Sequence, residues 1–275
     1  MRKLKALRRT PWLIALVVGV LALAAAAVQA APAIMTITPK HADDVTNVDV
    51  LRQQIANYYG DENKTGTFAP DSNYAKEASD VAADGAKWLA KQAKESHSKK
   101  LRGTPAIVLD VDDTTLATWN YEIFSNWAFN PTTNATFVNG ELFPAVPGMV
   151  QMATDAAKEG YSIFFLTGRP PTQAAATIGN LTTDALPPPA IHNGYPTPTG
   201  LFTKPRFGID PYPPYLTEAC GAVACTTTQY KTATRQHLEA TGYDIVANFG
   251  DQFSDLNGGF ADKTFKMPNP NYFIP

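Results

Sequence analysis

Cysteine and positive charge are both scarce in this chain. Its 275 residues include two Cys, and 23 Lys and Arg stand against 25 Asp and Glu. Two cysteines cannot form the framework of a small disulfide-rich domain, and a protein that wraps a nucleic-acid backbone normally carries an excess of cations. With 44% hydrophobic and 17% charged residues, the composition also excludes disorder, collagen-like repeats and coiled coil for the chain as a whole.

The first thirty residues have the layout of a cleavable secretory signal, and we predict residues 1–30 to be a signal peptide. A hydrophobic run from Trp12 to Val28 is followed by small residues at Val28 and Ala30. The run is preceded by five cations: Arg2, Lys3, Lys5, Arg8 and Arg9. Removing this segment would leave 18 Lys and Arg against 25 Asp and Glu, a net charge of −7.

Export predicts a secreted, periplasmic or cell-surface protein with no stable membrane span after cleavage. An uncleaved anchor helix is the alternative, although a run of about 17 residues is slightly short for a bilayer. The Arg8–Arg9 pair leaves the export route, general secretory or twin-arginine, open.

Beyond the leader, the hydrophobic pattern changes from helical to strand-like near residue 104. Residues 31–103 predict an N-terminal helical extension, with helices near Val48–Tyr59 and over 72–97. After it, short apolar runs predict five strands: Pro105–Leu109, Tyr161–Leu166, Gly200–Thr203, Tyr243–Phe249 and Thr264–Met267. Helical segments at Gly148–Glu159 and Thr232–Ala240 separate them. Strands alternating with helices indicate an α/β core over 104–275 with a mostly parallel sheet.

Two segments do not fit a minimal α/β core. Residues from about 117 to 146 contain several aromatics, and residues from about 186 to 229 are rich in Pro, Gly and Thr. Both follow strands, on the side where α/β proteins place their sites. We therefore expect loops or a small cap over the site.

Asp110 and Asp112 follow the first strand of the core directly. In an extended segment, residues i and i+2 point the same way, so both carboxylates can address one ligand. Neighbouring carboxylates repel each other unless a cation or a shared proton intervenes, which favours a hard metal ion, most naturally Mg²⁺. The same Asp-Asp-Thr sequence, at residues 112–114, also suits a simple turn.

Polar residues end two further strands. Thr167, Gly168 and Arg169 offer a hydroxyl, an unhindered backbone N–H and a guanidinium, which suit a phosphate oxygen. Asp251 and Asp255 follow the Tyr243–Phe249 strand and share a face if a helical turn starts there. A simple turn and a helix cap are the alternatives for the two segments.

Lys231 and the cysteines complete the candidates. Lys231 opens the helical segment Thr232–Ala240 and could offset the carboxylates, although most lysines are merely solvated; Lys204 is the fallback. Cys220 and Cys225 lie five apart in a loop-like stretch, and in an oxidising compartment we expect them to form a disulfide.

In their order along the chain, these segments resemble the haloacid dehalogenase (HAD) superfamily of phosphatases. The match is close to its acid-phosphatase branch, subfamily IIIB, with bacterial class C enzymes, plant acid phosphatases and vegetative storage proteins. The segments that carry it are 108–114, 165–169, 230–235, 250–256 and 265–275. The resemblance implies a HAD-like Rossmannoid sheet flanked by helices, with a small cap from the N-terminal helices and the insertions.

The resemblance also implies a role for each motif residue. Asp110 would be the nucleophile and Asp112 the general acid and base, with its backbone carbonyl on Mg²⁺. Thr167 and Gly168 would bind the phosphate. Lys231 would neutralise the nucleophile and the phosphate. Asp251 would bind Mg²⁺ directly, and Asp255 would be a ligand or would support one.

The implied function is a secreted Mg²⁺-dependent acid phosphatase that hydrolyses small phosphomonoesters, nucleotides or aryl phosphates among them, through an aspartyl phosphate. A catalytically weak storage or binding protein on the same fold is the alternative. The chain departs from the branch at Asp113, where Glu is usual, and in the Pro-rich insertion at 207–228. The aromatics Trp119, Tyr121, Phe124, Trp127 and Phe129 suit either stacking on a leaving group or the core of a cap.

Overall fold

Five strands alternate with helices in a computed structural model of the chain, which describes residues 38–96, 102–182 and 190–274. The strands are β1 (Thr104–Leu109), β2 (Ser162–Thr167), β3 (Gly200–Thr203), β4 (Tyr243–Gly250) and β5 (Thr264–Lys266). The α-helices are α1 (Val48–Tyr58), α2 (Asn73–Ser96), α3 (Trp119–Ser125), α4 (Pro131–Asn139), α5 (Met149–Lys158), α6 (Ala174–Leu181), α7 (Pro214–Cys220), α8 (Thr227–Ala240) and α9 (Phe253–Leu256). Short 3₁₀ helices lie at η2 (Ala42–Asp44) and η3 (Pro171–Gln173).

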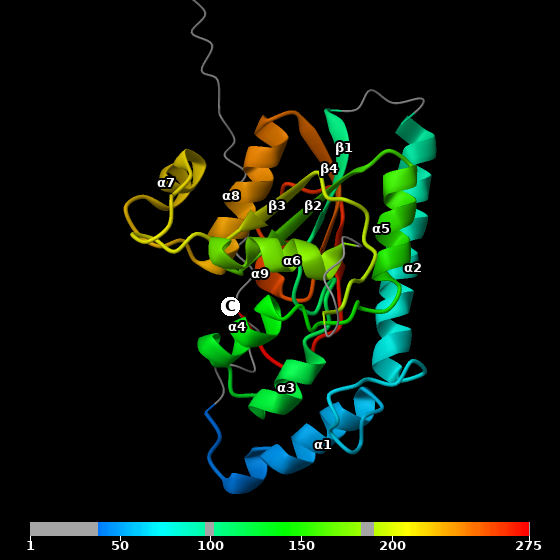
Figure 1. Ribbon diagram of the computed structural model, residues 1–275, viewed down its shortest axis with the longest axis vertical. Coiled ribbons are helices and arrows are strands. Elements are labelled where there is room, and N and C mark those ends of the chain that lie inside the picture. The colour runs from blue at the N-terminus through cyan, green and yellow to red at the C-terminus, as the bar shows by residue number, and fades with distance from the viewer. Residues whose placement is uncertain (1–37, 97–101, 183–189, 275) are drawn as a thin grey trace, which may run out of the picture.

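The strands form one parallel sheet in the order β3-β2-β1-β4-β5, with β1 at its centre (Figure 1). Val108 of β1 lies between Phe164 of β2 and Asn248 of β4. Parallel neighbours need long crossover connections, and the helices between the strands supply them. The predicted α/β architecture with a parallel sheet flanked by helices is confirmed.

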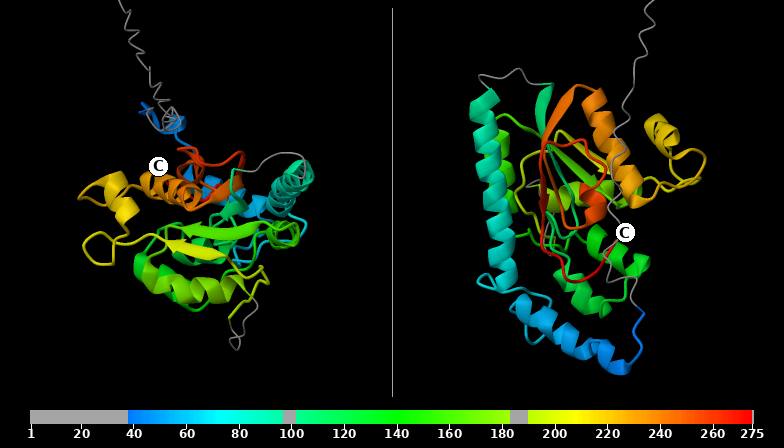
Figure 2. Two further views of the ribbon diagram at one scale, coloured as in Figure 1. Left: turned by 90° about the horizontal axis from the view of Figure 1, so that it is seen from above. Right: turned by 180° about the vertical axis from the view of Figure 1, so that it is seen from behind.

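Alternate residues of β1 face opposite layers of helices, as the two-residue period of a strand requires. Ile107 and Leu109 pack in one apolar cluster with Leu89 of α2 and Met152 of α5. Ala106 belongs to a second cluster that includes residues of α7 and α8. Figure 2 shows these helices on the two sides of the sheet. A central strand buried on both faces explains its continuous apolar sequence.

A β-bulge in β4 interrupts this alternation. Ala106 pairs with Ile245 and Ile107 with Ala247, so Val246 is the extra residue of the bulge. The carbonyl oxygen of Val246 accepts a hydrogen bond from Trp88 Nε1 of α2 at 3.2 Å. The bulge therefore ties the long helix α2 to the sheet.

Helices α1, α3 and α4 lie at the carboxyl end of the strands (Figure 1). The ring of Tyr59, just after α1, stacks on Trp119 of α3 with 4.2 Å between centroids. Trp119 Nε1 donates to a carboxylate oxygen of Asp61 at 2.9 Å. The segment 117–146, predicted as loops or a small cap, contains α3 and α4 and packs against the N-terminal helices. We call α1, α3 and α4 the cap.

Helix α8 begins five residues earlier than the predicted segment Thr232–Ala240. Thr226 Oγ1 accepts the backbone N–H of Gln229 at 3.1 Å, and Gln229 Oε1 accepts the N–H of Thr226 at 2.9 Å. This reciprocal capping box starts the helix before its apolar pattern begins. Lys231 therefore lies inside α8 rather than at its start.

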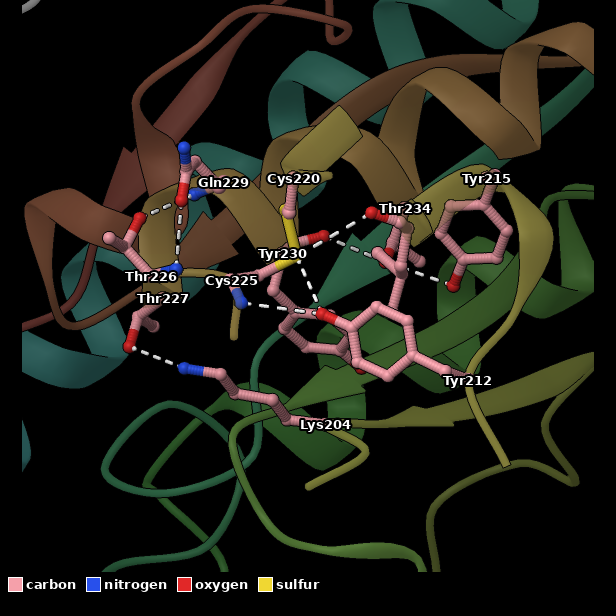
Figure 3. Close-up of a disulfide and its surroundings, with 11 residues drawn as sticks. Lys204, Tyr212, Tyr215, Cys220, Cys225, Thr226, Thr227, Gln229, Tyr230 and Thr234 are labelled. Atoms are coloured by element: carbon pink, nitrogen blue, oxygen red, sulfur yellow. Dashed lines mark hydrogen bonds between the residues drawn. A yellow bond between two sulfur atoms is a disulfide. The ribbon is translucent and has the colours of Figure 1, made fainter. Parts of the chain in front are cut away.

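The Pro-rich insertion contains helix α7 and the cysteine pair. Pro214 occupies the first turn of α7, where its missing N–H costs nothing. Cys220 and Cys225, the pair that the sequence predicted, are joined in a disulfide (Figure 3). The hydroxyl of Tyr212 donates to Cys225 Sγ at 2.9 Å and accepts the N–H of Cys225 at 3.3 Å. Residues 186–189, the start of the longer predicted segment from about 186 to 229, lie outside the described residues.

The predicted signal peptide, residues 1–30, also lies outside the described residues. Within the ranges that the structure describes, every helix is too short or too polar to cross a bilayer.

Gly85 of α2 allows a close approach between helix and sheet. A Cβ placed on Gly85 would stand 2.5 Å from two ring carbons of Phe249 in β4. Such a distance requires the ring or the helix to move. The mid-helix glycine, which costs about 1 kcal/mol in helix propensity, is thus explained by packing.

Gly85→Val should therefore destabilise the protein by about 2–4 kcal/mol, because it overpacks the contact with Phe249 and adds a β-branched residue to a helix. Ala83→Val, at an exposed position of the same helix, is the matched control and should cost about 0.5 kcal/mol. Denaturant unfolding of both variants measures the difference. Equal losses would contradict the packing role of Gly85.

Candidate active site

Two carboxylates from neighbouring strands meet at the carboxyl edge of the sheet. Asp110 follows β1, and its backbone N–H continues the ladder by donating to Phe249 O of β4 at 3.0 Å. Asp251 follows β4. Both residues are buried. Adjacent parallel strands end side by side, so the fold itself brings the two acids together.

Asp255 joins them from the short helix α9. Its Oδ2 accepts the backbone N–H of Gln252 at 2.8 Å, which fixes the turn after β4. A Cβ on Gly250 would lie 2.3 Å from Asp255 Cβ, so only glycine permits this approach. Oxygen atoms of Asp110, Asp251 and Asp255 lie within 4.8 Å of one another. We call these three residues the acid cluster.

Lys231 reaches the acid cluster from α8. Its Nζ forms an ion pair with Asp110 Oδ1 and another with Asp255 Oδ1, the latter at 2.6 Å. Burial alone would lower the pKa of Lys231, but the two carboxylates raise it above its ordinary value. Lys231 therefore stays charged. Among the described residues, it is the cation that forms ion pairs with the acid cluster.

One lysine does not balance three buried carboxylates. Burial and the neighbouring Asp255 raise the pKa of Asp110 to about 7, although Lys231 opposes the shift. Burial, Asp255 and Asp110 together raise the pKa of Asp251 well above its ordinary value. Like charges held this close need a further cation to remain ionised. Carboxylate oxygens are ligands for hard divalent cations, so the acid cluster fits a metal ion.

Asp251 is held by three side chains that the sequence analysis did not assign to the site. Gln252 Nε2 and Asn269 Nδ2 each donate to Asp251 Oδ2 at 2.6 Å, and Thr114 Oγ1 donates to Oδ1 at 3.4 Å. Thr114, Gln252 and Asn269 all lie in segments that carry the family resemblance: 108–114, 250–256 and 265–275. Their position in these segments hinted at a role in the site, but the sequence pattern did not indicate that they bind Asp251.

Asp112 is bound by Arg169, which corrects the expectation that the guanidinium serves a phosphate oxygen. Arg169 Nη2 lies 2.6 Å from Asp112 Oδ1, and Nε donates to both carboxylate oxygens at 3.2 and 3.1 Å. Nη1 donates to Thr177 Oγ1 at 3.0 Å. The neighbouring strands β1 and β2 place the two motifs side by side, so the guanidinium orients Asp112.

Thr167 and Gly168 lie at the end of β2, beside the end of β1. Thr167 Oγ1 accepts the backbone N–H of Arg169 at 3.1 Å, which fixes its side chain. Gly168 is exposed, and a Cβ there would meet no heavy atom within 4 Å. The backbone at Gly168 is therefore open to a ligand.

Lys204, the fallback lysine, does not reach the acid cluster. Its Nζ donates to Thr227 Oγ1 at 3.3 Å. Burial and the charge of Lys231 lower the pKa of Lys204. Lys231 is thus the lysine that the fold brings to Asp110.

The chain matches the family described as HAD superfamily, subfamily IIIB (acid phosphatase), over residues 34–275. The chain belongs to this family. The match covers the acid cluster, Asp112, Thr167 and Lys231, so the resemblance seen in the motifs extends to the whole region that the sheet and cap occupy.

Curated relatives of the family are plant proteins. The chain is 36% identical over 148 residues to the stem 28 kDa glycoprotein of Glycine max, covering 53% of this chain and 50% of that protein. It is 28% identical to acid phosphatase 1 of Solanum lycopersicum, covering 62% and 60%. Vegetative storage proteins of Arabidopsis thaliana also match. The chain spans about half the length of the curated relatives it matches.

A solved structure has the same fold. The class C acid phosphatase from Bacillus anthracis with tungstate bound aligns with a TM-score of 0.53 at 20% identity, covering 81% of this chain and 86% of that one. This likeness confirms the HAD-like fold.

Asp113, where the family usually has Glu, ties the motif to the cap. Its backbone is left-handed, with φ 53°. Its carboxylate accepts the N–H of Thr118 at 2.9 Å and the hydroxyl of Thr118 at 2.5 Å. Burial raises the pKa of Asp113 to about 6 against the effect of these bonds. The shorter Asp reaches Thr118, the residue that precedes α3.

The predicted aromatic group divides into buried and exposed members. Trp119 and Tyr121 are each 1% exposed and belong to the apolar core. The hypothesis that they stack on a leaving group is therefore wrong for these two residues. Phe124 and Phe129 are exposed on the cap. Trp127 is partly buried against Trp119 and donates to Asn271 Oδ1 at 3.3 Å.

Replacing Lys231 should expose the repulsion within the acid cluster. Lys231→Met leaves buried carboxylates without their cation, and in EDTA it should destabilise the fold by about 3–5 kcal/mol. Adding Asp255→Asn should recover part of the loss. Lys204→Met, which removes one hydrogen bond, is the control and should cost about 1 kcal/mol. Similar losses for the two lysines in chemical denaturation would contradict the role given to Lys231.

Proposed function

We propose that this chain is an exported Mg²⁺-dependent phosphomonoesterase that acts through an aspartyl phosphate on Asp110. The observation that carries the proposal is the contact of Asp110 with Lys231 inside the acid cluster, at the carboxyl edge of the sheet. Membership of the acid-phosphatase family supports it. Small phosphomonoesters are the substrate class, since the chain has no excess of cations for a nucleic acid.

Asp110 is the nucleophile of the proposed reaction. A carboxylate oxygen of Asp110 attacks phosphorus, and the bond from phosphorus to the leaving oxygen breaks. Lys231 offsets the charge of Asp110 and of the incoming phosphate. Thr167 and the open backbone at Gly168 bind phosphate oxygens. The neighbouring ends of β1 and β2 support this division of tasks.

Asp112 is the general acid and base. It gives a proton to the leaving oxygen in the first step and takes one from the water that attacks the aspartyl phosphate in the second. That attack releases inorganic phosphate and restores the Asp110 carboxylate. Arg169 keeps Asp112 in place beside the nucleophile.

Asp110, Asp251 and Asp255, with the backbone carbonyl of Asp112, are the proposed ligands of Mg²⁺. The bound ion supplies positive charge that lets a carboxylate nucleophile approach a phosphate dianion. Gln252 and Asn269 orient Asp251 for ligation, because their amides both donate to its Oδ2.

A storage or binding protein with little catalysis is the second candidate, because vegetative storage proteins are among the relatives. The chain retains Asp110 in contact with Lys231, and Asp112 in contact with Arg169. The presence of these catalytic candidates favours the enzyme. Turnover of nitrophenyl phosphate decides between them: a rate indistinguishable from that of buffer, with Mg²⁺ present, would support storage.

Metal removal should abolish activity. The acid cluster carries more negative charge than Lys231 offsets, so without Mg²⁺ a phosphate dianion is repelled. EDTA should reduce kcat at least a hundred-fold, and added Mg²⁺ should restore it. Full activity in EDTA, with metal content measured as absent, would refute Mg²⁺ dependence.

Substitution of the two carboxylates of the first motif should impair turnover in different ways. Asp110→Asn removes the attacking anion and should leave no turnover on any ester. Asp112→Asn should slow alkyl esters strongly, because their alkoxides need a proton, whereas nitrophenolate leaves without one. With nitrophenyl phosphate we expect Asp112→Asn to give a burst of nitrophenol followed by slow turnover, because hydrolysis of the aspartyl phosphate still needs the base. Wild-type rates for Asp110→Asn would contradict the assignment. So would the absence of a nitrophenol burst when Asp112→Asn acts on nitrophenyl phosphate.

A further inference from the structure

The last described residues of the chain, 267–274, connect the cap with the acid cluster. They follow β5 at the edge of the sheet and run toward the cap (Figure 1). The first of them, Met267, is buried, and its backbone N–H donates to Gly250 O at 2.9 Å. The segment therefore starts beside the end of β4, next to Asp251. We call residues 267–274 the C-terminal segment.

Asn271 of this segment is bound on the cap side by both polar atoms of its amide. Nδ2 donates to the hydroxyl oxygen of Tyr59 at 2.9 Å, and Oδ1 accepts a hydrogen bond from Trp127 Nε1 at 3.3 Å. Tyr59 directly follows α1, and Trp127 follows α3. Both rings pack against Trp119. The position of Asn271 is thus set by aromatic side chains that are themselves fixed by packing.

Asn269 connects Asn271 with the carboxylate of Asp251. Its Oδ1 accepts the backbone N–H of Asn271 at 2.8 Å, and its Nδ2 donates to Asp251 Oδ2 at 2.6 Å. A side-chain amide has one acceptor oxygen and one donor nitrogen, so the contact with Asn271 turns the donor toward the carboxylate. A continuous chain of hydrogen bonds therefore runs from Tyr59 and Trp127 through the two asparagines to Asp251.

Gln252, the second amide that donates to Asp251 Oδ2, is held by the same segment. Its Nε2 also donates to Tyr272 O at 3.3 Å, and its Oε1 accepts the N–H of Ile274 at 3.0 Å. Two amides thus direct one oxygen of Asp251, and the C-terminal segment fixes both. Asp251 Oδ1 has a longer contact, with Thr114 at 3.4 Å, so it is the oxygen better placed to bind a cation.

We propose that Asn271 is a positioning residue through which the cap sets the affinity of the acid cluster for Mg²⁺. This inference rests on the proposed Mg²⁺ site and adds residues that tune it. Partners that orient a metal ligand strengthen metal binding, because the ligand is already in place when the ion arrives. Without its bonds to the cap, Asn271 would release the amide of Asn269. Asp251 would then lose a donor that directs its carboxylate.

Removal of one hydroxyl on the cap side tests the inference. Tyr59→Phe keeps the ring that stacks on Trp119 but removes the oxygen that accepts Asn271 Nδ2. Mg²⁺ is titrated into the full-length protein after treatment with EDTA and desalting, and calorimetry gives the Kd. The Kd should rise about five-fold in Tyr59→Phe, and about ten-fold or more in Asn269→Ala, which removes the donor to Asp251 itself.

Tyr58→Phe is the matched control for Tyr59→Phe. Tyr58 is the neighbouring tyrosine, and its hydroxyl donates to Glu77 Oε2 at 2.6 Å, outside this chain of hydrogen bonds. Its Kd for Mg²⁺ should stay within about two-fold of wild type, as expected for an independent site. Equal increases in the two tyrosine variants, or an unchanged Kd in Tyr59→Phe, would overturn the inference and leave the Mg²⁺ site intact. A wild-type protein that binds no Mg²⁺ would overturn the Mg²⁺ site and the inference with it.

A pair of asparagines separates positioning from a general loss of cap stability. Asn120 of α3 also uses both atoms of its amide, since Nδ2 donates to Leu142 O at 2.8 Å and Oδ1 accepts the N–H of Tyr121 at 2.8 Å. Asn271→Ala should raise the Kd for Mg²⁺ about ten-fold, whereas Asn120→Ala should leave it within about two-fold of wild type. Equal increases would mean that any loosening of the cap weakens the metal site, and would overturn the role of Asn271.

A double variant tests the route from the cap to Asp251. If Tyr59 acts through Asn269, then Tyr59→Phe should have no further effect on the Kd for Mg²⁺ in a protein that already carries Asn269→Ala. The full effect of Tyr59→Phe in that background would show that the hydroxyl acts by another route, and would overturn the inference.

Discussion

The ion pairs of Lys231 with Asp110 and Asp255 are the contacts on which the site depends. They join three separate parts of the chain: the end of β1, helix α8 and the short helix α9. A buried lysine that remains charged needs carboxylates around it, and buried carboxylates at this spacing need the lysine. The pair is a poor source of net stability, because desolvation offsets much of its attraction, but it defines where Asp110 can stand. The residual negative charge of the acid cluster makes this part of the structure complementary to a metal cation.

The parallel order of the strands gives the site two sides, one at the end of β2 and one at the end of β4. Since β2, β1 and β4 are neighbours, Thr167, Asp110 and Asp251 end at one edge of the sheet. Arg169 from the β2 side holds Asp112, while Gln252 and Asn269 on the β4 side hold Asp251. The proposed phosphate-binding residues and the proposed metal ligands therefore occupy adjacent positions. The cap lies over the same edge and is tied to it through the hydrogen bonds between Asp113 and Thr118.

Much of this arrangement could be predicted because it depends on patterns along the chain. Apolar runs that end in Asp110 and Asp251 indicated strand ends, and strand ends of a parallel sheet converge. Other features depend on partners that no spacing reveals. Arg169 was expected to face phosphate, but β1 and β2 place it beside Asp112. The helix α8 starts early because Thr226 and Gln229 cap it. Asn269 reaches Asp251 from the last segment of the chain, eighteen residues away along the chain, and only the fold brings the two together.

The central claim, that Asp110 carries the phosphoryl group, is tested most directly by locating the covalent intermediate. The protein with Mg²⁺ should be mixed with nitrophenyl phosphate, quenched in acid within milliseconds and reduced with borohydride, which converts an aspartyl phosphate to homoserine. Using Asp112→Asn, in which hydrolysis of the intermediate is slowed, should raise the yield. Peptide mass spectrometry should then find homoserine at position 110. Homoserine at any other aspartate, or a phosphate recovered on another residue type, would contradict the account.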